Sequence, residues 1–106
     1  MNKVHYEALN ETVYTEVLDN GLQVVLIPKN KYSKTYGIFT TDFGSIDNQF
    51  IPINGDKESK IPDGIAHFLE HKLFEGEVHD AFEDFAKYGA SANAFTSFTR
   101  TSYLFS

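Results

Sequence analysis

The sequence predicts an α+β fold, in which helices pack on one face of an antiparallel β-sheet. Strand-like segments occupy both ends of the chain, at residues 13–43 and 91–105, and two helix-like segments lie between them, at about 63–75 and 80–88. Strands that are grouped before and after a run of helices, rather than alternating with them, are typical of this class.

Length and composition favour one globular domain and exclude several classes of protein. The chain has 106 residues and is 42% hydrophobic, with ten Phe and six Tyr, so it can form a packed core. A net charge of -6 argues against a nucleic-acid partner. No apolar run approaches 18 residues and the N-terminus lacks a signal peptide, so we expect no membrane association and a cytoplasmic location. Because the chain has no cysteine, any zinc site must use histidine and carboxylate ligands.

The first part of the chain predicts a β-hairpin and a third strand. Residues 1–12 are polar and read as an arm without regular structure. Apolar residues flank Asn20-Gly21, a pair that favours a type I′ turn, so residues 14–27 predict a hairpin. Residues 35–43 carry apolar groups on both faces and predict a strand covered on both sides. Residues 46–62 predict a long loop, of a kind that is often functional or mobile.

The second part predicts two helices and a strand pair. Asp63 is expected to cap the first helix, and Gly76 to end it. Its apolar stripe consists of Ile65, Phe68, Leu69 and Leu73. The second helix, 80–88, is expected to bury Phe82, Phe85 and Ala86 and to end before Gly89. Residues 91–105 are rich in Thr, Phe and Tyr and predict an antiparallel strand pair.

A five-residue stretch of the first predicted helix contains three side chains that are suited to metal chemistry. His67 and His71 are one turn apart on one helix face, where both imidazoles can reach a single Zn²⁺ ion. Glu70 is placed to contact water at such an ion and to accept its proton. The order His-x-x-Glu-His is that of the inverted zinc peptidases. The alternative is a helix whose two histidines simply face solvent.

Two points are left open by the residues alone. A catalytic zinc takes three protein ligands, and the internal candidates for the third are Glu75, Glu77, His79, Glu83 and His5, none of them convincing. Asn93, Ala94 and Phe95 could lie on an exposed strand that pairs with an extended peptide. On physical grounds alone, a polar strand-edge position is the simpler interpretation of Asn93.

The chain resembles the pitrilysin/insulinase family of zinc metallopeptidases, which includes insulin-degrading enzyme and the mitochondrial processing peptidase. The resemblance covers most of residues 14–105. Its motifs are residues 18–24 (LDNGLQV), 44–47 (GSID), 64–74 (GIAHFLEHKLF), 89–96 (GASANAFT) and Thr101-x-Tyr103-x-Phe105, in the family's order. Lys72 stands where the family more often has Met.

The resemblance implies a zinc endopeptidase that hydrolyses peptides or unfolded segments. His67 and His71 would be zinc ligands, Glu70 the base, and Asn93, Ala94 and Phe95 part of the strand that receives substrate. The family's third ligand is a downstream glutamate, so residues 1–106 look like the first half of an N-terminal catalytic domain. Further domains of the same protein or a homologous subunit would be partners. The chain alone would then be inactive; the alternative is a non-catalytic subunit or peptide-binding module.

Overall fold

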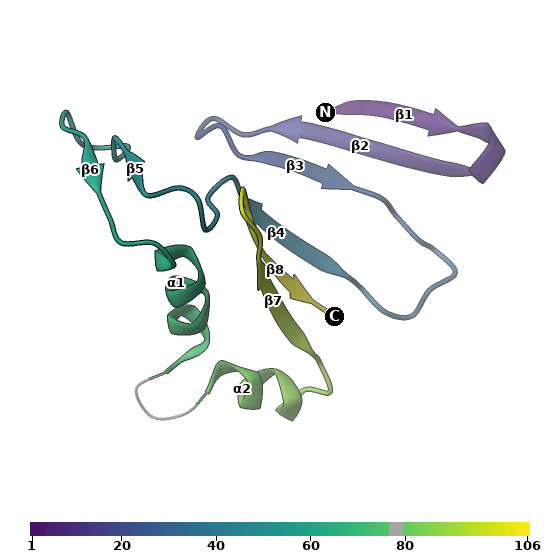
Figure 1. Ribbon diagram of the computed structural model, residues 1–106. Helices are drawn as coiled ribbons and strands as arrows, with labels where there is room; N and C mark the ends of the chain where they lie inside the picture. The colour runs from purple at the N-terminus through teal and green to yellow at the C-terminus, as the bar shows by residue number, and fades with distance from the viewer. Residues whose placement is uncertain (77–79) are drawn as a thin grey trace. The chain divides into compact units, whose positions relative to one another are not determined.

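The computed structural model describes residues 1–76 and 80–106, which form two compact units, 1–33 and 34–106 (Figure 1). Antiparallel strands together with two α-helices make the fold α+β, as predicted. No helix in the described part of the chain is long and apolar enough to cross a membrane. That residues 1–106 belong to one catalytic domain stays a prediction.

The first unit is a three-stranded antiparallel sheet in the order β1-β2-β3. Its strands are β1 (Asn2–Tyr6), β2 (Glu11–Val17) and β3 (Gln23–Leu26), and a short 3₁₀ turn (Glu7–Leu9) joins the first two. The expected polar arm at residues 1–12 is therefore wrong. Backbone pairing with β2 orders β1. All of its residues are exposed, so no buried apolar face marks this strand.

The predicted hairpin is present as β2 and β3, but its turn is not of type I′. Type I′ needs positive φ at both central residues, and of Asn20 and Gly21 only Gly21 has it, at 85°. The Gly21 amide donates to the Leu18 carbonyl over 2.8 Å. The Asn20 side chain accepts a bond from the Leu22 amide over 3.0 Å, a local interaction that is common for asparagine in turns.

The second unit contains the sheet that carries the predicted C-terminal strands. Its order is β4-β8-β7, all antiparallel, with β4 at Gly37–Thr41, β7 at Ala92–Thr96 and β8 at Thr101–Phe105. The strand predicted at 35–43 and the pair predicted at 91–105 are thus confirmed. The expectation that the first of these strands is covered on both sides is wrong, because Ile38 and Phe39 on its two faces are 56% and 50% exposed. In the described sheet β7 lies at one edge. Within the loop predicted at 46–62, β5 (Gln49–Phe50) and β6 (Ser59–Lys60) form a small antiparallel ladder that the sequence did not reveal.

The link between β7 and β8 is held by the segment that follows β4. The Ser45 amide donates to the Ser97 carbonyl over 2.9 Å, and the Ile46 amide donates to the Phe98 carbonyl over 3.1 Å. Gly44 is buried here, and a Cβ atom at this position would lie 2.4 Å from the Phe98 carbonyl oxygen. The close approach of the two backbones therefore requires glycine.

The two helices are α1 (Ile65–Phe74) and α2 (Ala81–Lys87). The capping role predicted for Asp63 is wrong, because Gly64 is the N-cap of α1, with φ 86°, and no side chain caps it. Asp63 instead accepts a hydrogen bond from the Asn48 amide group over 2.9 Å. Helix α1 ends at Phe74, slightly before the predicted Gly76. The end of α2 matches the prediction, since Gly89 follows it with a φ of 67°.

Helix α1 packs on β7 and β8 through a face other than the predicted apolar stripe. Ala66 and Phe74 are buried, and Glu70 between them is half-buried. Phe68, Leu69 and Leu73 are 57%, 45% and 67% exposed, so most of the predicted stripe is uncovered. Likewise, Phe82 and Ala86 of α2 are exposed, although Phe82 stacks on Phe74 with ring centroids 4.4 Å apart and Phe85 is half-buried.

Candidate metal centre

Two histidines of α1 bring their ring nitrogens together, as their spacing predicted. The Nε2 atoms of His67 and His71 lie 3.0 Å apart, and the ring centroids are separated by 4.7 Å. Both side chains are on an exposed side of the helix. Zinc binds imidazole nitrogen at roughly 2.0–2.1 Å, so two nitrogens at this separation can bind one ion. The donor set therefore fits zinc.

Glu70 lies beside this pair and forms a hydrogen bond with a residue of the sheet. One of its oxygens and the two imidazole nitrogens all lie within 4.8 Å of one another. Its Oε2 atom accepts a hydrogen bond from the hydroxyl of Thr96, 26 residues later, at the end of β7. The sequence does not predict this role for Thr96, because only the packing of β7 against α1 brings the two residues together.

Apart from His67, His71 and Glu70, the described residues offer no further ligand for the same ion. Within residues 1–76 and 80–106, the group of donors close enough to hold one ion consists of His67, Glu70 and His71. Among the predicted candidates, Glu75 instead pairs with Lys72 over 2.7 Å. Glu83 lies in the first turn of α2, and His5 lies in the first unit, 3.0 Å from the Thr12 hydroxyl. The candidates Glu77 and His79 lie outside the described residues.

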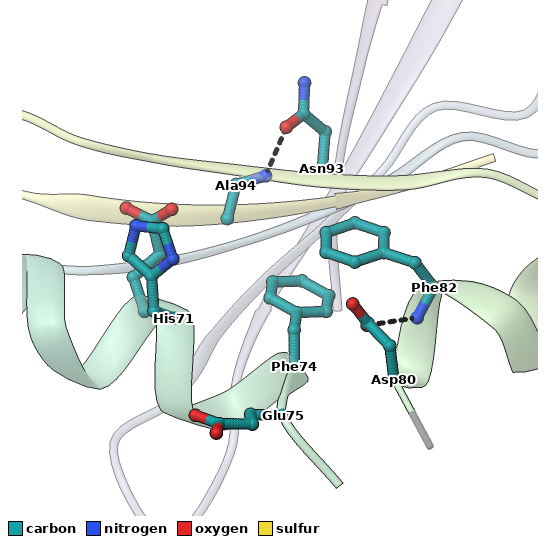
Figure 2. A pocket seen from close by; sticks show the side chains of 8 residues that line it. His71, Phe74, Glu75, Asp80, Phe82, Asn93 and Ala94 are labelled. Carbon is teal, nitrogen blue, oxygen red and sulfur yellow. Dashed lines mark hydrogen bonds between the residues drawn. The ribbon is translucent and has the colours of Figure 1, made fainter.

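A cavity of about 370 Å³ opens beside the histidine pair (Figure 2). Figure 2 shows His71 close to the β7 backbone at Ala94, with the stacked rings of Phe74 and Phe82 beside them. The cavity therefore combines ionisable, polar and aromatic side chains. It is lined by Glu70, His71, Phe74, Glu75, Asp80, Phe82, Asn93 and Ala94.

The edge strand β7 turns alternate backbone groups outward along this cavity. Ser91 and Ser106 exchange two backbone hydrogen bonds, of 2.8 and 2.9 Å. By the antiparallel alternation, Asn93 also bonds to β8, while the N–H and C=O of Ala94 point to the free edge. The Ala94 amide donates to the Asn93 side chain over 2.9 Å. The structure thus places residues 93–95 on an edge strand, and their role in binding substrate stays a prediction.

Two pKa values near the site depart from their usual ranges. Burial, and secondarily the negative charge of Glu70, raises the pKa of Tyr103, which pairs with Ala94 across the sheet. Tyr103 therefore stays neutral at physiological pH. The hydrogen bond and the positive charge of Lys72 lower the pKa of Glu75, so this exposed carboxylate stays ionised.

Comparison with known proteins connects this geometry to a family of peptidases. Residues 56–106 match the family described as Insulinase (Peptidase family M16). The chain is 60% identical over 103 residues to the uncharacterized zinc protease YmfH of Bacillus subtilis, covering 97% of this chain and 24% of that protein. It is 35% identical over 94 residues to insulin-degrading enzyme-like 2 of Arabidopsis thaliana, covering 84% of this chain and 9% of that protein.

A solved structure has the same fold. It is the crystal structure of an M16-like peptidase from Alicyclobacillus acidocaldarius, with a TM-score of 0.80 and 45% sequence identity, over 96% of this chain and 23% of that one. The chain therefore spans about a quarter of the length of YmfH and of this crystallised protein.

Proposed function

Because the chain belongs to the insulinase (M16) family of peptidases, we propose that it carries part of the active site of a zinc-dependent endopeptidase. The observation that supports this most directly is the pair of imidazole nitrogens 3.0 Å apart with the Glu70 carboxylate beside them. The proposed substrates are peptides or unfolded polypeptide segments. The cytoplasmic location stays a prediction.

In this proposal the histidines bind the metal and Glu70 handles the proton. His67 and His71 hold zinc through their Nε2 atoms. Zinc supplies Lewis-acid chemistry, since it lowers the pKa of water and polarises a peptide carbonyl. Glu70 accepts the proton of the attacking water and then delivers it to the leaving amine, as a general base and acid. Its side chain is half-buried on the face of α1 that packs against the sheet.

The substrate is proposed to bind as an additional strand on β7. An extended peptide that pairs with an edge strand gains main-chain hydrogen bonds that do not depend on its sequence. The outward carbonyl and amide of Ala94 lie at that edge, next to Glu70 and His71 around the cavity. Asn93 and Phe95 are exposed on the other face of the strand. This arrangement would bring a peptide bond to the metal with its backbone already aligned.

A third zinc ligand is proposed to come from outside the described residues. If Glu70 is the base, His67 and His71 are two ligands of the three that a catalytic zinc requires. Residues 1–106 by themselves are then expected to be inactive. The alternative, a non-catalytic subunit or peptide-binding module, is disfavoured because the two histidines and the glutamate are all present and brought together.

The test is the substitution Glu70→Gln in the longest natural polypeptide that contains residues 1–106. Glutamine keeps the shape of the side chain but cannot accept the proton. We expect zinc content to stay equal to that of the parent and kcat on an unstructured peptide to fall about 10²- to 10⁴-fold. Zinc content is measured by elemental mass spectrometry. The peptide-cleavage assay also includes the 106-residue chain alone.

Two matched controls accompany this experiment. Glu83→Gln makes the same change on the exposed side of α2 and should leave kcat unchanged. His71→Ala should remove zinc, whereas His5→Ala, in the first unit, should not. Parental turnover in Glu70→Gln would contradict the role as base, and cleavage by the 106-residue chain would contradict the need for a further ligand.

A further inference from the structure

The carboxylate of Glu70 is anchored by a residue to which the proposed chemistry gives no role. Thr96 Oγ1 donates a hydrogen bond to Glu70 Oε2. A glutamate side chain has several rotatable bonds, and fixing it costs conformational entropy. A hydrogen bond to an ionised group is about twice as strong as one between neutral groups, and more so where water is partly excluded. Thr96 can therefore hold one conformation of Glu70.

The sheet register explains why Thr96 can reach α1. In β7 the half-buried residues Ala92, Ala94 and Thr96 alternate with the exposed Asn93 and Phe95. Side chains on a strand alternate between its two faces, so the first three residues share the face covered by α1. The two alanines leave room for the helix, and Thr96 is the member of this row that carries a hydrogen-bond donor on its side chain.

Thr96 is itself held in place from both sides. Its register partner on β8 is Thr101, a fully buried residue whose hydroxyl donates to the Phe43 carbonyl over 2.7 Å. The next residue, Ser97, accepts a backbone bond from Ser45. Because threonine is β-branched, its χ1 angle is also restricted on a strand. The hydroxyl is therefore presented to Glu70 from a fixed backbone with little rotational freedom.

We propose that Thr96 is a positioning residue for peptide hydrolysis. Its hydroxyl donates a hydrogen bond to Oε2 of Glu70. The other carboxylate oxygen is then available to the attacking water beside His67 and His71. This inference rests on the proposed function, in which Glu70 is the base. It adds a requirement that the helix motif does not contain: the orientation of the base depends on a strand that lies 26 residues further along the chain.

A purely structural role for Thr96 predicts something different. If the hydroxyl only fastened α1 to the sheet, its loss would loosen the helix and would lower stability, zinc affinity and turnover together. A positioning role acts on the transition state through Glu70. Its loss would lower kcat and kcat/KM equally, and it would leave the two imidazole nitrogens and their affinity for zinc unchanged.

The experiment uses Thr96→Val and Thr96→Ser in the longest natural polypeptide that contains residues 1–106. Valine keeps the β-branched shape and removes the hydroxyl, and serine keeps the hydroxyl. We expect Thr96→Val to lower kcat about 10- to 100-fold, with KM and zinc affinity within about twofold of the parent, and Thr96→Ser to restore most of the loss. Kinetics use an unstructured fluorogenic peptide, and zinc affinity comes from competition with a chelator.

Thr40→Val is the matched control. Thr40 lies in the same sheet, and its hydroxyl is 2.9 Å from the Ser102 hydroxyl, so the same substitution also removes a hydrogen bond. Ser102 neighbours Thr101 and Tyr103 on β8, so by alternation this pair lies on the face away from Glu70. Thr40→Val is expected to keep the parental kcat, which shows that the effect belongs to the Thr96 hydroxyl.

A double-mutant cycle with Glu70→Ala tests whether Thr96 acts through the carboxylate. Alanine leaves nothing for the hydroxyl to hold, so Thr96→Val should change kcat no further in that background. The inference is overturned if Thr96→Val has parental kcat, if its effect persists in the Glu70→Ala background, or if zinc affinity and kcat fall in parallel. Parental activity in Glu70→Ala would instead overturn the proposed function itself.

Discussion

At the scale of single residues, three members of the site could be predicted from the sequence and a fourth could not. His67, Glu70 and His71 could be predicted because one helix holds them and their spacing fixes their geometry. Thr96 could not, because its contact with Glu70 depends on the strand register and on how closely α1 approaches the sheet. The Asp63 prediction failed for a related reason, since the Asn48 side chain from a distant loop occupies its carboxylate.

Asp80 is a residue whose local role can be tested by itself. Its side chain accepts a hydrogen bond from the Phe82 amide over 2.9 Å and so caps α2. Asp80→Ala should destabilise this helix by about 1 kcal/mol, and Asp80→Asn should retain most of the cap. Hydrogen exchange of the α2 amides measures the effect, which corresponds to roughly fivefold faster exchange. Equal exchange in Asp80→Ala and the parent would show that packing alone holds α2.

At the scale of elements, strand positions were predicted better than burial. The hairpin, the strand at 35–43 and the pair at 91–105 follow from turn residues and β-branched or aromatic composition, which are local properties. The apolar stripe on α1 was assigned to the wrong face. Helical periodicity identifies a face whose burial would be energetically favourable. The small side chains Ala66, Ala92 and Ala94 determine where the helix can approach the sheet.

The contact between Gly44 and the β7–β8 link predicts a clear difference between two glycines. Gly44→Ala places a Cβ atom 2.4 Å from the Phe98 carbonyl oxygen, so the backbone must shift. We expect a loss of about 1–3 kcal/mol in the free energy of unfolding, measured by urea titration of the longest natural polypeptide that contains the chain.

Gly37→Ala is the control for this prediction. A Cβ atom there meets only Phe105 Cδ2, at 3.8 Å, an ordinary contact. Since alanine is less costly than glycine in a strand, Gly37→Ala should be neutral or slightly stabilising. Equal effects of the two substitutions would contradict a special close approach at Gly44.

At the scale of the whole molecule, much apolar surface is left uncovered. Among the described residues the buried apolar side chains are Ala66 and Phe74, whereas Phe68 and Leu73 are largely exposed. A second cavity, of about 410 Å³, is lined almost entirely by apolar side chains, among them Phe39, Leu73 and Phe85. The chain spans about a quarter of the length of YmfH and of the Alicyclobacillus acidocaldarius protein, and exposed patches of this kind commonly mark contact surfaces.

The isolated 106-residue chain is therefore expected to self-associate. Sedimentation velocity should show an average sedimentation coefficient that rises with concentration, and Leu73→Glu should reduce this rise. Ile53→Glu is the control, because it adds the same charge at a fully exposed loop position. A single monomeric species at all concentrations would contradict the expectation, as would equal effects of the two substitutions.

The different origins of the metal ligands and of the anchor for Glu70 have a consequence for the order of events during folding. His67 and His71 belong to one helix, so their nitrogens meet as soon as that helix forms. The hydrogen bond from Thr96 forms only after β7 has paired and α1 has docked. If the proposed function holds, the two histidine ligands can come together before the base is oriented. Proteolysis then begins only with the assembled tertiary structure, which would protect neighbouring unfolded chains from premature cleavage.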